Sequence, residues 1–163
     1  MGSNILKLRN FLDPADVIHV QPPVSHAQCV ACGPGGLLGL RFRPDGTRSV
    51  IASIRPRPEW QGYSGILHGG MVSTLLDAAM THCLFHHAIE AMTASLKVRF
   101  FEPTPCAGLL DLRATLSDRR RHVYLLEAEL VTNGRVLARA EARFISASEA
   151  RRPGRGKLHG HSD

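Results

Sequence analysis

The chain has 163 residues, of which 44% are hydrophobic, and a formal net charge of +6. This length suits one compact domain and is too short for two ordinary ones. No apolar stretch reaches the roughly 18 residues of a membrane helix, and the N-terminus lacks a secretory signal. We therefore expect a soluble, cytoplasmic protein with an N-terminal extension (residues 1–27), one domain (28–147) and a basic, disordered tail (148–163).

The positive charge is concentrated locally. Arg119, Arg120 and Arg121 are adjacent, and further basic residues lie in the Gly/Pro/Ser-rich tail. Aromatic residues make up only 6% of the chain and do not alternate with basic ones, so we do not expect a nucleic-acid partner. A small ligand that carries phosphates fits the charge better.

The four cysteines, Cys29, Cys32, Cys83 and Cys106, are too few and too scattered for a disulfide scaffold. Cys29 and Cys32 form a Cys-x-x-Cys pair preceded by His26, which could bind zinc or cycle between redox states. A closed zinc site uses four ligands, however, and no second pair follows in the sequence. We expect a structural pair that binds no metal.

The first half of the chain predicts two strands followed by one long helix. A short helix is expected at about residues 5–12, before an extended segment that contains several prolines. Strands are predicted at residues 38–43 and 49–55, on either side of the turn Pro44-Asp45-Gly46. An irregular loop over residues 56–65 then leads into a helix at about residues 70–87.

Four further strands are predicted after the helix. Apolar and polar residues alternate from residue 96 to the prolines at 103 and 105, over residues 110–116 and 124–130, and over residues 136–144 after the Asn133-Gly134 hairpin signal. Two strands, one apolar helix and four strands predict an α+β fold, in which an antiparallel sheet wraps around one long central helix.

The most informative motif is His68-Gly69-Gly70, which opens the predicted helix. Backbone N–H groups at the positive end of a helix are unpaired and can hold an oxyanion. Asp77 follows two turns further along this apolar helix, where a buried acid needs a reason. A structural explanation stays open, because a Gly-Gly pair can form a tight turn and an aspartate can bond a neighbouring hydroxyl.

Three segments of the chain carry a resemblance to a known family. They are residues 61–70, which end in His68-Gly69-Gly70, then Leu75-Leu76-Asp77, and residues 95–103. Together they resemble the hot-dog-fold acyl-CoA thioesterases, in the branch of the phenylacetic acid pathway and of Arthrobacter-type 4-hydroxybenzoyl-CoA thioesterase. The resemblance covers about residues 28–146.

The resemblance implies hydrolysis of an acyl-CoA thioester without a metal or another cofactor. The backbone N–H groups of Gly69 or Gly70 would hold the oxyanion, and Asp77 of the facing subunit would act as base or nucleophile. Family members assemble across the sheet edge, so a homodimer or a dimer of dimers is expected, with acyl-CoA as partner and no membrane.

Three further side chains are candidates near this motif. His68 is expected to order the turn and make a polar contact, and Thr81 to position the nucleophile or water, unless its hydroxyl bonds the helix backbone. Relatives often carry Asn or Gln six residues before the histidine. This chain has Gly62 there, so Gln61 can take that role only if the loop shifts by one residue.

Basic side chains near the site are candidates for binding the phosphates of coenzyme A: Lys97, Arg99 and Arg120. Each could equally be a solvated charge at a strand edge. His82, His86 and His87 could suggest a metal site, but adjacent side chains on a helix diverge by about 100°. We expect them to be favourable cations at the helix C-terminus.

Two functions other than thioester hydrolysis occur on a hot-dog fold. A non-catalytic hot-dog protein could bind acyl-CoA without cleaving it, but a binder has no need of Asp77 beside the acyl carbonyl. The hydratase and dehydratase branch of the fold pairs Asp and His in a different motif, which this sequence lacks.

Overall fold

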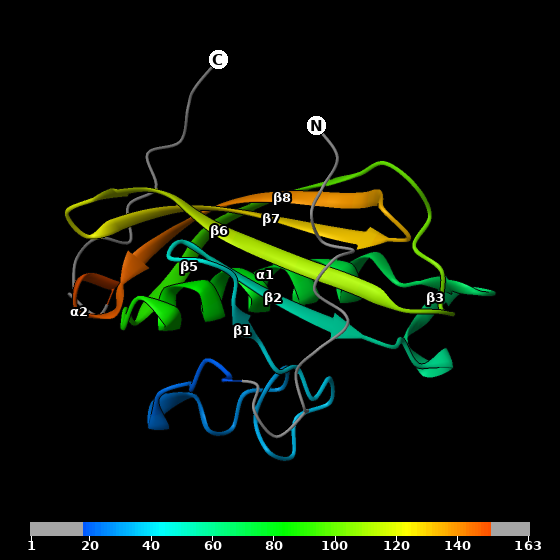
Figure 1. The fold of residues 1–163 in the computed structure, drawn as a ribbon, viewed down its shortest axis with the longest axis horizontal. Coiled ribbons are helices and arrows are strands. Elements are labelled where there is room, and N and C mark those ends of the chain that lie inside the picture. The colour runs from blue at the N-terminus through cyan, green and yellow to red at the C-terminus, as the bar shows by residue number, and fades with distance from the viewer. Residues whose placement is uncertain (1–17, 151–163) are drawn as a thin grey trace, which may run out of the picture.

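A six-stranded antiparallel sheet lies over one long helix in the computed structural model, which describes residues 18–150 (Figure 1). The strand order is β1-β2-β6-β7-β8-β5, and a separate pair is formed by β3 and β4. The elements are β1 (Arg43–Pro44), β2 (Ser49–Ile54), β3 (Gln61–Tyr63), β4 (Ile66–Leu67), α1 (Gly69–His86), β5 (Ala91–Phe100), β6 (Leu110–Arg120), β7 (Val123–Thr132), β8 (Arg135–Ser146) and α2 (Ala147–Ala150). The predicted fold class is confirmed.

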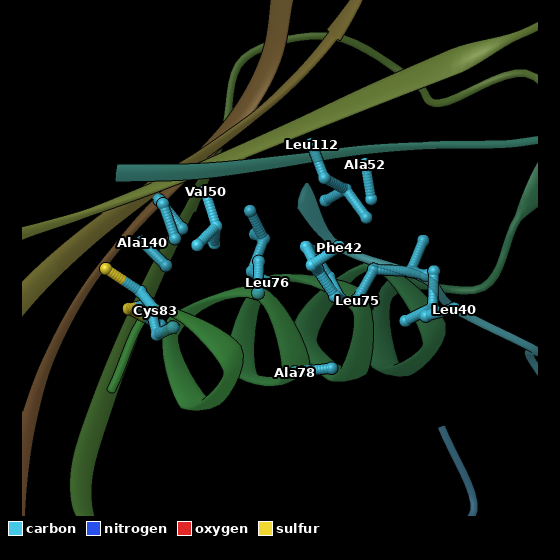
Figure 2. Packing of buried hydrophobic residues seen from close by; sticks show 14 of the residues in the cluster. Leu40, Phe42, Val50, Ala52, Leu75, Leu76, Ala78, Cys83, Leu112 and Ala140 are labelled. Carbon is cyan, nitrogen blue, oxygen red and sulfur yellow. The ribbon is translucent and has the colours of Figure 1, made fainter. Parts of the chain in front are cut away.

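One side of α1 packs against the concave face of the sheet. Leu76 is fully buried there, beside Val50 of β2 and Ala140 of β8 (Figure 2). Apolar side chains alternate along the sheet strands, so each strand turns one row of them toward the helix. Burial of these rows supplies the main driving force for folding.

The opposite side of α1 is covered by residues 18–42, which run across the helix on the side away from the sheet (Figure 1). Val20, Cys32 and Phe42 of this segment belong to the same hydrophobic core as the helix. The Phe42 ring stacks on His82 with ring centres 4.6 Å apart. The helix is therefore enclosed on two sides, as its all-round apolar composition predicts. Within residues 18–150, no helix is long and apolar enough to cross a membrane.

The predicted strand at residues 38–43 is wrong, because β1 contains only Arg43 and Pro44. The backbone before it is hydrogen-bonded elsewhere: the N–H groups of Leu38 and Leu40 donate to the carbonyls of Val30 and Ala31. Apolar and polar residues alternate in this segment as they do in a strand. Its backbone N–H groups, however, donate to the preceding loop and not to a neighbouring strand.

The loop predicted over residues 56–65 contains regular structure. A 3-10 turn at Pro58–Trp60 leads directly into β3, which pairs with β4. Gly65 turns the chain between these strands at a φ of +73°, a conformation that glycine adopts without a steric penalty.

The predicted turn signals are confirmed. Gly46 has a φ of +78°, and Asn133 and Gly134 both have positive φ, as a two-residue hairpin between β7 and β8 requires. The predicted helix at residues 5–12 and most of the predicted tail lie outside the described residues.

The two edges of the sheet differ in length. β1 at one edge has 2 residues, whereas β5 at the other has 10. Most β5 side chains are exposed, and within residues 18–150 no strand pairs with its outer edge. A long unpaired edge of this kind is a template for pairing with another chain.

Shortening Leu76 to alanine tests the packing of α1 under the sheet. Because Leu76 is fully buried, Leu76→Ala leaves a cavity and should lower the free energy of unfolding by about 2–5 kcal/mol in urea denaturation. Leu37→Ala is the control, since that side chain is 49% exposed and the change should stay within about 0.5 kcal/mol. Equal losses for both variants would contradict the packing described above.

Candidate active site

The His-Gly-Gly turn is held by two neighbouring segments. The N–H of His68 donates to the Trp60 carbonyl at 2.9 Å, and the N–H of Leu67 donates to the Thr104 carbonyl at 2.8 Å. Trp60 and Thr104 are both buried. The start of α1 is therefore fixed relative to the core on both sides.

His68 is the N-cap residue of α1. Its backbone is extended, and its Nδ1 accepts a 2.9 Å hydrogen bond from the Gly70 N–H. Because Nδ1 is the acceptor, the proton of a neutral ring lies on Nε2. This hydrogen bond supports the expected role of His68 in ordering the turn. Because Nδ1 already accepts the Gly70 N–H, it is not available as a base.

Only one of the first four N–H groups of the helix is left without an acceptor. Gly70 bonds the His68 ring, and the N–H groups of Met71 and Val72 donate to the His68 carbonyl at 2.9 and 3.1 Å. Within residues 18–150, the N–H of Gly69 has no acceptor. Of the two oxyanion donors considered from sequence, Gly69 is therefore the available one.

Gly69 lines an apolar hollow of about 390 Å³. Its lining includes Tyr63, Leu67, Val72, Phe100 and Phe101. Tyr63 is 82% exposed, and the two phenylalanines are about half exposed. Exposed aromatic side chains around a hollow indicate a surface that a ligand or another chain covers.

Asp77 contacts the edge strand. Its Oδ1 accepts a 2.7 Å hydrogen bond from the Thr93 hydroxyl of β5, and its side chain is partly buried. This bond orients the carboxylate toward the β5 edge. Thr93 was missed at the sequence level because the alternating pattern became clear only from residue 96, whereas β5 begins at Ala91.

The other hydroxyls of the polar stripe on α1 serve the helix itself or remain unpaired. Ser73 and Thr74 donate to the carbonyls of Gly69 and Gly70, four residues earlier. Within the described part of the chain, the Thr81 hydroxyl makes no hydrogen bond. Thr93, not Thr81, is the hydroxyl in contact with Asp77.

Gln61 and Gly62 both support the turn. The Gln61 Oε1 accepts a 3.0 Å hydrogen bond from the Gly65 N–H, which closes the β3–β4 hairpin. Gly62 packs against His68, where an added Cβ would lie 3.2 Å from the ring carbon Cδ2. A larger residue at position 62 would be in tight contact with the His68 ring, which favours glycine there.

The three cations predicted to bind phosphate, Lys97, Arg99 and Arg120, do not lie together at one place in the chain. Arg120 forms a 2.7 Å ion pair with Asp118. In the strand register, Arg120 of β6 is aligned with Met92 of β5. Met92 lies at the opposite end of β5 from Phe100. Lys97 lies in the second half of β5, opposite Glu141.

Arg99 has a neighbour that sequence reasoning missed. The guanidinium groups of Arg99 and Arg139 lie 5.8 and 5.9 Å from the Phe101 ring centre. The two arginines pair across β5 and β8. Because Phe101 also lines the hollow, this arginine pair lies beside it.

The expectation that His82 is a cation at the end of α1 is wrong. His82 is 2% exposed, and burial lowers its pKa to about 4, so the ring is neutral at pH 7. His86 faces the β1–β2 turn instead, with its Nε2 3.2 Å from the Gly46 carbonyl oxygen. Burial also lowers the pKa of His87.

Known proteins have sequences related to this chain. The thioesterase superfamily model matches residues 64–139. The acyl-coenzyme A thioesterase THEM4 of Bos taurus is 29% identical over 109 residues, which are 65% of this chain and 44% of that protein. This chain therefore spans less than half the length of that curated relative.

Solved structures share the fold. A thioesterase superfamily protein is 26% identical with a TM-score of 0.66, over 69% of this chain and 60% of its own. A phenylacetic acid degradation-related protein of Ralstonia eutropha JMP134, described as a candidate thioesterase, is also 26% identical, with a TM-score of 0.63 over 77% and 92% of the two chains. Residues 64–139 thus match the thioesterase superfamily, and the chain has the hot-dog fold.

Removing the His68 ring tests its role as N-cap. His68→Ala leaves the Gly70 N–H without its acceptor and should lower the free energy of unfolding by about 0.5–2 kcal/mol in urea denaturation. His68→Asn should restore most of this loss, because asparagine is a favourable N-cap residue. If the alanine variant is as stable as the wild type, the bond to Gly70 does not stabilise the helix.

Proposed function

We propose that the protein hydrolyses acyl-CoA thioesters. The observation that carries this proposal is the unpaired N–H of Gly69, a residue that lines an apolar hollow at the positive end of α1. A thioester carbonyl placed in the hollow would direct its oxygen at this N–H, where the negative charge that develops on attack is stabilised. The relationship to an acyl-coenzyme A thioesterase supports this chemistry.

Asp77 supplies the second requirement, a group that attacks the carbonyl or activates water. As general base it takes a proton from water while the hydroxide adds to the carbonyl carbon. As nucleophile it forms an anhydride that water then cleaves. On either route the C–S bond breaks, and coenzyme A leaves as a thiol after gaining a proton. The Thr93 hydroxyl holds the carboxylate for this step.

Gly69 and Asp77 of one chain are too far apart to act on one carbonyl. They are eight residues apart on α1, which corresponds to about 12 Å along the helix axis. A catalytic group needs to lie within about 3 Å of the atom on which it acts. The complete site therefore combines Gly69 of one subunit with the partner subunit's Asp77.

The β5 edge provides a way to build this composite site. Phe100 at one end of β5 lies beside Gly69, and Thr93 near the other end contacts Asp77. When two copies of β5 pair antiparallel about a twofold axis, the end of one strand meets the beginning of the other. The Gly69 turn of one protomer then faces the partner's Asp77. A homodimer, alone or within a tetramer, is thus the active form.

Charge near the hollow suits the phosphates of coenzyme A. Arg99 and Arg139 flank Phe101, and Lys97 lies further along the same strand. We assign phosphate binding to these three side chains in place of Arg120, which lies at the end of the sheet away from Phe100. The Arg139 Nε also lies 3.6 Å from the Glu129 Oε2, so a bound phosphate would compete with that carboxylate.

Replacing the Asp77 carboxylate by an amide tests the chemistry. Asp77→Asn keeps the size of the side chain and can still accept the Thr93 bond, but it cannot act as base or nucleophile. We expect a loss of roughly 100-fold or more in kcat, measured as thiol release from a panel of acyl-CoAs, with unchanged thermal unfolding. Asp118→Asn is the control and should keep full activity. A folded Asp77→Asn protein that turns over normally would refute the mechanism.

Mixing two inactive variants tests the composite site. In Gly69→Val the side chain should extend into the hollow beside Phe100 and shield the N–H. Neither this variant nor Asp77→Asn should be active alone. Mixed dimers formed by co-expression contain one intact site each, so about a quarter of wild-type activity should return. Light scattering should show at least a dimer. No recovery in demonstrated mixed dimers would place both groups in one chain's site.

A further inference from the structure

Three metal-ligating side chains come together in the segment that covers α1. The donor atoms of His26, Cys29 and Cys32 all lie within 4.8 Å of one another, and both cysteines are free thiols. In a tetrahedral site with Zn–S bonds of about 2.3 Å, two sulfur ligands lie about 3.8 Å apart. The three donors are thus close to the separation at which they share one ion.

The backbone around the two cysteines is tightly constrained. The Gly33 N–H donates to the Cys29 carbonyl at 2.8 Å, and the Cys29 N–H donates to the His26 carbonyl at 3.1 Å. At Gly33, a Cβ would lie 2.6 Å from the Ala27 carbonyl oxygen, and at Gly36 it would lie 2.7 Å from that of Cys29. Side chains are excluded at both positions, so the loop holds the three donors at short range.

Polar groups lie beside both cysteines. The Ala31 N–H donates to the Cys29 Sγ at 3.4 Å. Burial and the neighbouring Cys29 raise the pKa of the Cys32 thiol to about 12, so a metal ion has to displace its proton. The Arg41 guanidinium donates to the Cys32 carbonyl at 2.8 Å, which brings a positive charge next to the buried residue. Two thiolates and one imidazole are a donor set that suits zinc.

A second imidazole adjoins this group. The His82 ring centre lies 6.3 Å from that of His26, and neither His82 nitrogen has a hydrogen-bond partner within the described residues. Buried polar atoms without partners are rare and call for an explanation. His82 is thus a second imidazole near His26, with both nitrogens unpaired within the described residues, although it lies outside the group of three donors.

We propose that His26, Cys29 and Cys32 bind one divalent metal ion of the zinc class. The ion replaces the two thiol protons, which are released to solvent, so that two thiolates balance its charge. Its role is structural: it ties His26 to the loop that contains the cysteines, and Ala31 and Cys32 of this loop belong to the core that covers α1. The sequence predicted no metal because no second Cys-x-x-Cys pair follows, and spacing alone could not show that His26 folds back onto the pair.

The metal content of the purified protein tests this site directly. The full chain is expressed in zinc-supplemented medium, purified without chelator and analysed by elemental mass spectrometry. We expect about one zinc per chain in the wild type and in the matched control Cys106→Ser, and nearly none in Cys29→Ser/Cys32→Ser and in His26→Asn. Cys106 is a partly buried free cysteine outside the group.

A second measurement uses only the wild type, in case the variants fail to fold. Zinc is removed with a chelator and replaced by Co²⁺, whose thiolate-to-metal charge-transfer band reports sulfur ligands. We expect this band to appear with one equivalent of Co²⁺ and the thermal unfolding temperature to fall on chelation and to recover with zinc. Metal-free protein from zinc-supplemented cells, a Cys29–Cys32 disulfide, or zinc retained in the double variant would each overturn the proposal. None of these readouts depends on thioesterase activity.

Discussion

The enclosure of α1 is the constraint on which the rest of this structure depends. The helix is apolar nearly all round, so it must be covered on both sides, by the curved sheet on one and by residues 18–42 on the other. Only its ends and the strip facing β5 remain open. These open parts hold the two groups of the proposed chemistry: the free Gly69 N–H lies at the beginning of the helix, and Asp77 lies against the edge strand. Because the helix is held rigidly, both groups are positioned without relying on a mobile loop.

The turn before α1 stabilises the start of the helix and leaves one backbone N–H group unpaired. His68 satisfies three N–H groups, one through its ring and two through its carbonyl, and leaves the Gly69 N–H free. This arrangement also explains the local glycines. A Cβ at Gly70 would lie 3.0 Å from the His68 Nδ1, and a Cβ at Gly62 would press on the same ring from the other side. The ring thus favours small residues around it, and the capped helix start and the free Gly69 N–H are two results of one conformation.

Assembly follows from the same geometry. In a helix that lies along a strand, groups two turns apart cannot meet at one carbonyl, so a single subunit presents half of a site at each end of β5. Antiparallel pairing of two such edges would make both halves complementary and would also cover the exposed aromatic residues Phe100 and Phe101. The cysteine loop stands apart from this edge. It lies on the covered side of α1, where a bound ion would act on the stability of the enclosing layer.

The sequence by itself determined the fold class, the helix with its His-Gly-Gly start, and the residue types of the site, because these depend on local patterns: period-two strands, an apolar helix, and turn glycines. It could not determine which groups meet across the fold. The strand predicted at residues 38–43 is a segment whose amides bond the cysteine loop. Thr93 takes the place beside Asp77 that Thr81 was expected to hold, and His82 is neutral where a cation was expected. His26 reaches the two cysteines only through a turn of the backbone. Each of these depends on contacts between distant residues and on burial, which only the tertiary structure decided.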